Sequence, residues 1–215
     1  MIKIIDDFFD DPDSVVSLSE TMEFSLKNPQ WPGVRTQDLR KHAPNVKDMF
    51  VKHICDNYPR LNPFELNRDF RSGFQKITSF SKDQYDLKNK GWAHRDTNTL
   101  WAGILYLNKN PEPDTGTSAY RVKRGFSHQF ADEINIKEMQ YRSENVDDAE
   151  YDKAYDAMRN QFEETVSIAN VYNRFVLFNN VTHHGVQTFG TKPRLTLNFF
   201  GMGQYGKIPP VMRSR

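Results

Sequence analysis

The stretch GWAHRDTNTLWAGILYL, residues 91–107, carries the strongest strand signal in this 215-residue chain. Residues 101–107 are apolar without a break and rich in aromatic and branched side chains. Asn108 and Pro111 follow as turn residues. A short apolar run of this kind, bounded by turn residues, predicts a buried β-strand.

The same stretch places two metal-ligating side chains just before that strand, in the triplet His94-Arg95-Asp96. Side chains two positions apart in an extended chain point to the same face. His94 and Asp96 can therefore offer an imidazole nitrogen and a carboxylate to one point, with Arg95 facing away. The triplet alone is a weak signal, since so short a motif recurs by chance.

Further strands are predicted on both sides of this stretch. The runs 74–80, 174–178 and 194–200 are short, rich in aromatic and branched residues, and separated by turn residues. Several such runs predict a mainly β domain built as an antiparallel sandwich or barrel.

Helices are predicted outside this β region. Residues 2–24 suggest a short strand and then a helix capped by Asp13 or Ser14, and residues 45–55 suggest a second helix. Residues 147–158 are acidic and favour a helix inserted between two strands, with a solvated surface.

Composition sets limits on the class of protein. The length suits one domain with one sizeable core. The net charge of +1 gives no electrostatic footprint for nucleic acid. No apolar run approaches the roughly 20 residues that span a bilayer, and the mean hydropathy is −0.75. The start of the chain does not resemble a secretory signal, and Cys55 is the single cysteine, so we expect a cytoplasmic protein.

A third candidate ligand comes late in the chain, in the pair His183-His184 just past the predicted strand 174–178. Two histidines and one carboxylate leave three adjacent positions of a metal open, which is characteristic of iron(II) sites that activate oxygen. Either histidine of the pair could complete such a set.

Arg194 and Thr196 lie on the last predicted strand and share one face of it. An inward guanidinium grips a carboxylate with two parallel hydrogen bonds, and a hydroxyl can add a third. Beside the candidate metal ligands, the two residues predict a receptor for a carboxylate.

These motifs together resemble the iron(II)- and 2-oxoglutarate-dependent dioxygenases, on the prolyl-4-hydroxylase-like side. The resemblance runs from about residue 74 to residue 200. It rests on the segments His94–Asp96, Gly103–Asn108, Asp114–Thr117, His184–Val186 and Arg194–Thr196.

The resemblance implies a double-stranded β-helix, or jelly roll, with helices packed outside. It implies that His94, Asp96 and His184 bind the iron, and that Arg194, assisted by Thr196, binds the far carboxylate of 2-oxoglutarate. The co-substrates would be 2-oxoglutarate and O2. The spacing to Arg194 selects His184, and His183 would then point away.

The domain organisation expected from this resemblance is a single oxygenase domain over residues 1–215. Residues 1–70 would supply a strand and support helices, and residues 71–203 a jelly-roll core with a helical insert at about 131–166. The family's tyrosine on the first core strand is missing here, where Thr78 or Phe80 stands.

Other readings and roles stay open at this point. A cupin-like jelly roll using zinc or manganese as an isomerase or hydrolase could have the same ligands. A non-catalytic binding module with this fold is a second alternative. The primary substrate, a small molecule or a protein side chain, is not encoded in any motif. His128 is a candidate for contact with substrate, and Tyr106 and Asn108 are candidates for the pocket mouth.

Overall fold

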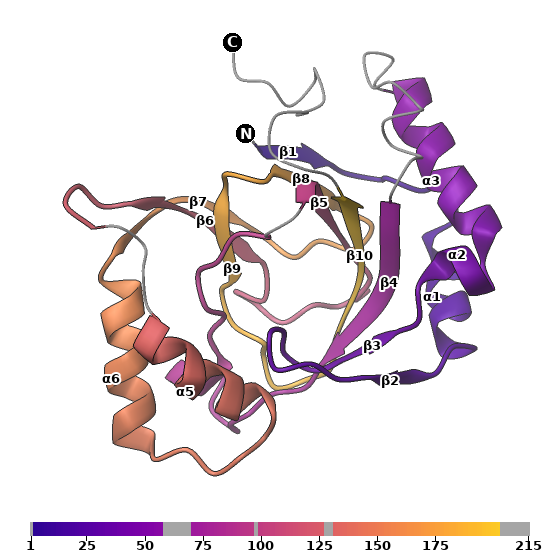
Figure 1. Ribbon diagram of the computed structural model, residues 1–215. Coiled ribbons are helices and arrows are strands. Elements are labelled where there is room, and N and C mark those ends of the chain that lie inside the picture. The colour runs from indigo at the N-terminus through magenta and orange to yellow at the C-terminus, as the bar shows by residue number, and fades with distance from the viewer. Residues whose placement is uncertain (1, 58–69, 97–98, 127–130, 203–215) are drawn as a thin grey trace.

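Two antiparallel β-sheets form the centre of the computed structural model, which describes residues 2–57, 70–96, 99–126 and 131–202 (Figure 1). The larger sheet has seven strands in the order β1-β8-β5-β10-β4-β3-β2. These strands are β1 (Ile2–Ile5), β8 (Phe175–Asn179), β5 (Thr99–Tyr106), β10 (Arg194–Met202), β4 (Phe70–Ile77), β3 (Val34–Thr36) and β2 (Phe24–Leu26).

The smaller sheet has the strand order β7-β6-β9 and faces the larger one. Its strands are β7 (Phe162–Ile168), β6 (Thr117–Val122) and β9 (His183–Val186). This arrangement confirms the predicted fold class, a mainly β jelly roll with flanking helices.

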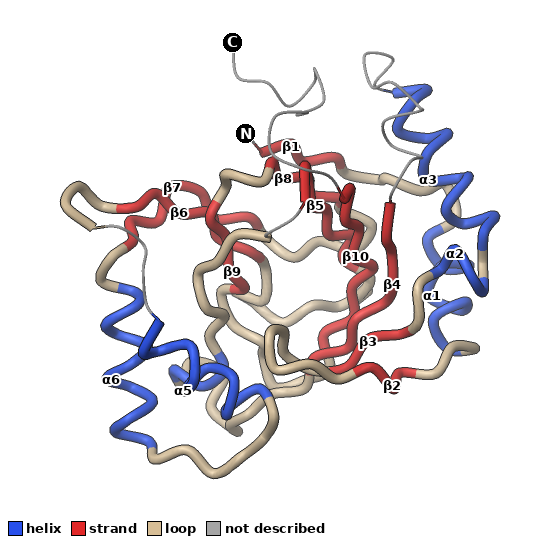
Figure 2. The backbone as a smooth tube through the Cα atoms, in the orientation of Figure 1, coloured by secondary structure: helices blue, strands red, loops and turns tan. Residues whose placement is uncertain are grey.

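The helices lie outside the sheets in two groups (Figures 1 and 2). One group lies beside β3 and β4 and consists of α1 (Pro12–Glu20), α2 (Leu39–His42) and α3 (Pro44–Asn57). The other lies at the opposite end, between β6 and β7 in the chain, and consists of α5 (Ala131–Tyr141) and α6 (Asp148–Arg159). A short 3-10 turn, Leu87–Asn89, precedes the His94 segment.

Strand β10 shows how the sequence divides into an outer and an inner face. Leu197 and Phe199 are fully buried in the core that the larger sheet forms with α1 to α3. There the Phe199 ring stacks on Phe50 of α3, with 3.8 Å between centroids. The alternate residues Arg194 and Asn198 face into the space between the two sheets and line a cavity. Period-two alternation thus directs the polar residues of a central strand inward.

Helix α6 was expected to be a solvated helix. One of its faces is exposed, as expected, but the other is buried. Tyr151, Tyr155 and Met158 are buried against Trp92, which precedes the His94 segment. The Trp92 indole N–H donates to the Tyr151 hydroxyl over 3.0 Å. The insert therefore supports the chain just ahead of the candidate site.

Several predicted boundaries differ from the structure. The helical part of the insert ends at Arg159, because the run from Phe162 pairs with β6 as strand β7. Helix α1 is capped by Asp11, whose side chain accepts from the Ser14 backbone, since Pro12 suits the first turn. No helix in the described parts of the chain is long and apolar enough to cross a membrane.

Candidate metal and co-substrate site

His94 and His184 meet through a two-residue backbone bridge that joins the His94 segment to β9. The backbone N–H of each donates to the carbonyl of the other, and both bonds are 2.9 Å long. Gly185 makes this approach possible, because a Cβ there would lie 2.9 Å from the Trp92 carbonyl oxygen. Residues 90 positions apart in the chain are thereby held face to face.

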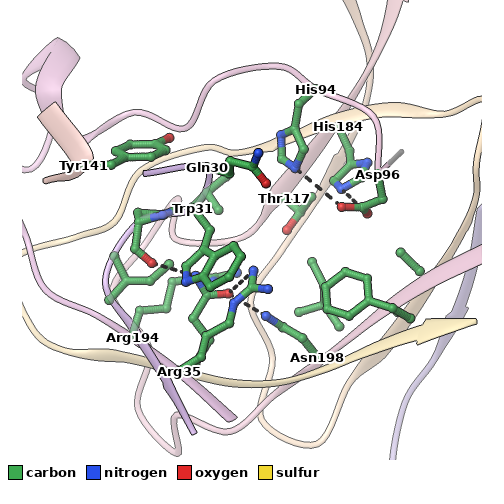
Figure 3. Close-up of a pocket in the computed structure, with 18 of the residues that line it drawn as sticks. Gln30, Trp31, Arg35, His94, Asp96, Thr117, Tyr141, His184, Arg194 and Asn198 are labelled. Atoms are coloured by element: carbon green, nitrogen blue, oxygen red, sulfur yellow. Dashed lines mark hydrogen bonds and ion pairs between the residues drawn. The ribbon is translucent and has the colours of Figure 1, made fainter. Parts of the chain in front are cut away.

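Three side chains converge beside this bridge (Figure 3). His94 Nε2 lies 4.0 Å from Asp96 Oδ1, and His184 Nε2 lies 3.3 Å from Asp96 Oδ2. One ligand atom from each of the three lies within 4.8 Å of the other two. Two imidazole nitrogens and one carboxylate form a donor set that fits iron(II) and leaves further coordination positions of the metal open.

Both imidazoles are held with Nε2 toward Asp96. His94 Nδ1 lies 2.9 Å from the Trp92 carbonyl oxygen, and His184 Nδ1 lies 3.2 Å from the Thr182 carbonyl oxygen. A hydrogen on each Nδ1 donates to these carbonyls and leaves the lone pair on Nε2, as is usual for ligating histidines. The His184 ring also stacks on Phe178, with centroids 4.5 Å apart.

The three groups have displaced pKa values. Burial, followed by the nearby His184, lowers the pKa of His94 to about 4. Burial alone would raise the pKa of Asp96, but the hydrogen bond and charge of His184 outweigh it, so the pKa is about 2. Burial likewise opposes the charge on His184, but Asp96 raises its pKa above the ordinary value. Asp96 is thus ionised and His94 neutral at neutral pH, as metal binding needs.

The neighbouring His183 points to the other side of β9, as expected. Its ring packs on Phe162, with 5.1 Å between centroids, and it lines a separate cavity beside Tyr120. The structure therefore brings His184, and not His183, to Asp96.

Arg194 is buried and opens into the same cavity as the three donors. Its Nε donates to the Thr115 carbonyl oxygen over 2.9 Å, whereas one terminal nitrogen, Nη2, has no hydrogen-bond partner among the described residues. Burial lowers the pKa of Arg194, which nevertheless stays charged. A buried guanidinium with an unused donor fits a carboxylate ligand such as that of 2-oxoglutarate.

Tyr106 lies beside Arg194, a position that was not predicted from the sequence. It was expected at the pocket mouth, but it is fully buried, and the Arg194 guanidinium carbon lies 5.3 Å from its ring centre. Its hydroxyl donates to Thr117 Oγ1 over 2.7 Å. The first core strand lacks the tyrosine that the resembling family has there, and Tyr106 instead brings a phenol close to Arg194 from the end of β5.

Thr196 shares the inward face with Arg194, as predicted. Its hydroxyl donates to Asn198 Oδ1 over 3.0 Å, and Thr196 is not among the residues that line the cavity. Asn108 was expected at the pocket mouth. Its side-chain oxygen instead accepts a hydrogen bond from the Leu195 N–H, which links the segment after β5 to the start of β10. His128 lies outside the described residues.

The cavity has a volume of about 80 Å³. Beyond the predicted residues, it is lined by Arg35 and Trp31 from the β2–β3 region and by Lys137 and Tyr141 from α5. None of these four residues was predicted from the sequence, because they lie far from the His94 and His184 motifs and belong to no recognisable pattern.

Comparison with solved structures shows the fold. A prolyl 4-hydroxylase from Phytophthora capsici matches at a TM-score of 0.50 and 14% identity, over 98% of this chain and 61% of that one. HygX from Streptomyces hygroscopicus, solved with nickel and 2-oxoglutarate bound, matches at a TM-score of 0.57 and 15% identity. The match covers 97% of this chain and 84% of the HygX chain. The 2-oxoglutarate-dependent epimerase SnoN from nogalamycin biosynthesis matches at a TM-score of 0.53 and 9% identity. The match covers 93% of this chain and 76% of the SnoN chain.

This chain spans about three fifths of the Phytophthora chain's length. No protein with a curated description matches the sequence. A family model described as "Family of unknown function (DUF6445)" matches residues 1–200.

Proposed function

The chain belongs to the family of unknown function DUF6445, and we propose that it is an iron(II)- and 2-oxoglutarate-dependent oxygenase that hydroxylates its substrate. The observation that carries the proposal is the meeting of two features in one cavity. The His94, Asp96 and His184 donors converge at one point, and a buried guanidinium nitrogen of Arg194 without a partner faces the same space.

In this proposal His94, Asp96 and His184 bind the metal through Nε2, a carboxylate oxygen and Nε2. Arg194 binds the far carboxylate of 2-oxoglutarate, and Tyr106 and Thr117 set the position of the guanidinium. Thr196 acts through Asn198, to which its hydroxyl donates. Residues 1–215 form one oxygenase domain of the prolyl-4-hydroxylase-like branch.

When bound, iron(II) and 2-oxoglutarate supply the oxidation in which O2 converts 2-oxoglutarate to succinate and CO2 and a substrate C–H becomes C–OH. The protein's part is to hold the reactants in place. The Nδ1 bonds to the Trp92 and Thr182 carbonyls fix both imidazole planes. The cavity walls limit water, so that the charges of Asp96 and Arg194 act at low dielectric.

The names of the similar proteins agree with this reaction class. HygX was solved with nickel and 2-oxoglutarate bound, and also with hygromycin B. We infer the same co-substrate here and a primary substrate that is a small molecule or a protein side chain.

The test is the visible charge-transfer band that forms when 2-oxoglutarate chelates iron(II) without air. We expect the band in the wild-type chain. Arg194→Ala should raise the Kd for 2-oxoglutarate by roughly 30-fold or more, because losing one partner of a buried charged pair costs about 2 kcal/mol or more. Arg121→Ala is the matched control, since Arg121 is an exposed arginine paired with Glu163.

The outcomes separate the alternatives. If the wild-type chain gives no band, the proposal is wrong, and a cupin-like jelly roll that uses zinc or manganese takes its place. If the band forms but no succinate appears in air with or without added substrates, the chain is a binding module. An equal Kd in Arg194→Ala and wild type would remove Arg194 from the co-substrate site.

A further inference from the structure

Two cations in the cavity have no carboxylate partner among the described residues. Arg35 comes from β3, in the N-terminal part of the chain, and Lys137 comes from α5 in the insert. Neither takes part in an ion pair within 4.0 Å in the described parts of the chain. Both are half-buried, so their charges are partly removed from water without the usual compensation.

Arg35 is fixed by neutral groups. Its guanidinium carbon lies 4.2 Å from the Trp31 ring centre and 5.4 Å from the Phe200 ring centre, and one terminal nitrogen donates to Gln75 Oε1 over 3.2 Å. Its Nε is buried and has no acceptor among the described residues, and the same holds for the Trp31 indole N–H. Arg35 Nε and the Trp31 indole nitrogen are thus two neighbouring buried donors that can each donate to a ligand. Figure 3 shows Trp31 and Arg35 against each other within the cavity.

Lys137 is also without a carboxylate of its own. Its ammonium lies 5.5 Å from the Tyr141 ring centre. The adjacent acid, Glu138, forms its ion pair with Arg142 over 3.2 Å, although its charge also acts on Lys137. Burial lowers the pKa of Lys137, and burial lowers that of Arg35 to about 10, as expected for cations with too little compensation.

The charges of the cavity do not balance. Among the described lining residues, Arg35, Lys137 and Arg194 are cations and Asp96 is the one carboxylate. This leaves two positive charges in excess. Iron(II) and doubly charged 2-oxoglutarate would add equal and opposite charge, so the excess would remain after both are bound.

The excess lies near the metal ligands. The charges of Arg35 and Lys137 both act on Asp96, whereas Arg194 lies beside Tyr106 and Thr115. One cation is thus placed for the co-substrate and two face the remaining space. Trp31 and Tyr141 flank that space with aromatic surface.

We propose that Arg35 and Lys137 form the receptor for an anionic group of the primary substrate, a carboxylate or a phosphate, which they hold beside the metal position. The proposal rests on the proposed function and deepens it. Arg35 and Trp31 donate to the anion, and Lys137 neutralises its charge from the α5 side. The excess positive field raises the local concentration of anions in the cavity.

Trp31 gives a readout that needs no known substrate. Of the three tryptophans, Trp92 and Trp101 are only 1% and 2% exposed. A quencher dissolved in water should therefore act mainly on Trp31. The full chain is titrated with iodide, an anionic quencher, and with neutral acrylamide, with and without zinc and 2-oxoglutarate. Zinc is chosen because it neither quenches nor reacts.

We expect Lys137→Met to lower the iodide quenching constant about twofold or more and to leave acrylamide quenching unchanged. Arg35→Gln should act in the same direction. Lys153→Met, an exposed lysine on α6, is the control and should change neither constant. Acetate and inorganic phosphate should protect Trp31 from iodide, and acetamide, the neutral match of acetate, should not.

Equal iodide quenching in wild type and Lys137→Met would overturn the inference, even if Arg35→Gln fails to fold. A rise in the Kd for 2-oxoglutarate in Lys137→Met or Arg35→Gln as large as in Arg194→Ala would also overturn it, because these cations would then belong to the co-substrate site. A wild-type chain without a charge-transfer band would refute the proposed function alone, since the quenching of the metal-free chain still tests the receptor.

Discussion

His94 and His184 contact the same carboxylate, but their pKa values are shifted in opposite directions. His94, with a pKa of about 4, is already neutral at physiological pH. His184 has a raised pKa because it bonds to Asp96, whose own pKa is about 2. If these three groups bind a metal as proposed, the metal displaces a proton from His184 but none from His94 or Asp96.

This difference predicts the proton balance of metal binding. Calorimetry of the metal-free chain with manganese(II) at pH 6, in buffers of different ionisation enthalpy, should show about one proton released per metal. Affinity should rise with pH by up to about tenfold per unit until pH exceeds the raised pKa of His184, and then level off. A release of two protons, or an affinity that falls as pH rises, would contradict the assignment.

The doubled histidine gives a second prediction at the scale of single residues. His184→Ala should abolish stoichiometric manganese binding, whereas His183→Ala should retain it within a few-fold, because the His183 ring packs on Phe162 across β9. Isothermal titration of both variants, with circular dichroism to confirm folding, makes the comparison. Loss of binding in His183→Ala with the fold intact would exchange the two roles.

Residues within one short motif could be predicted from the sequence, and residues that the fold brings in from elsewhere could not. His94 and Asp96 share a triplet, and Arg194 follows His184 at a fixed spacing. Arg35 reaches the same cavity from about 60 positions before the triplet, on a strand of three residues. No local pattern around Arg35 or Lys137 indicates this, because their placement depends on tertiary packing.

Helix α6 links the insert to the site through its packing on Trp92. The backbone carbonyl of Trp92 accepts from His94 Nδ1, and its ring contacts Tyr151 and Tyr155 at 6.1 and 5.8 Å between centroids. The insert therefore helps to orient His94, a proposed metal ligand, and it also carries α5 with Lys137.

This packing predicts the effect of a core substitution in α6. Met158→Ala should reduce the free energy of unfolding by about 2–5 kcal/mol, since Met158 is fully buried. Lys153→Ala, exposed on the same helix, should change it by less than about 0.5 kcal/mol. Urea denaturation measures both, and equal effects would mean that α6 does not pack as described.

Two central strands were predicted closely from the sequence because most of their side chains are buried. Strands β5 and β10 were predicted to within a few residues, and seven of the eight positions of β5 and six of the nine of β10 are buried. Strand β7 was missed because five of its seven residues are exposed, so the sequence shows little of the apolar character expected of a strand. Strand β9 was missed because its sequence, HHGV, reads as a ligand motif rather than a strand.

The fold brings together the three proposed ligands from two segments 90 residues apart, so we expect metal binding to be coupled to folding. The unfolded chain cannot hold His94 and His184 at one point, so a metal bound by both would stabilise the folded state. The jelly roll could be anticipated from the family resemblance, whereas the placement of α5 and β3 over the cavity required the structure.

This coupling predicts a thermal shift. Manganese(II) at about 100 times its Kd should stabilise the chain by roughly 2.7 kcal/mol, visible as a rise in Tm. The shift should disappear in His184→Ala and persist in Lys153→Ala. An equal shift in His184→Ala would mean that the stabilising metal binds elsewhere.

The most direct measurement is a crystal structure of the chain grown without air with manganese(II) and 2-oxoglutarate, manganese standing in for iron. We expect the metal on the imidazoles of His94 and His184 and the carboxylate of Asp96, with the distal carboxylate of 2-oxoglutarate on the Arg194 guanidinium. Metal density away from these three donors, or the diacid bound by Arg35 in place of Arg194, would contradict it.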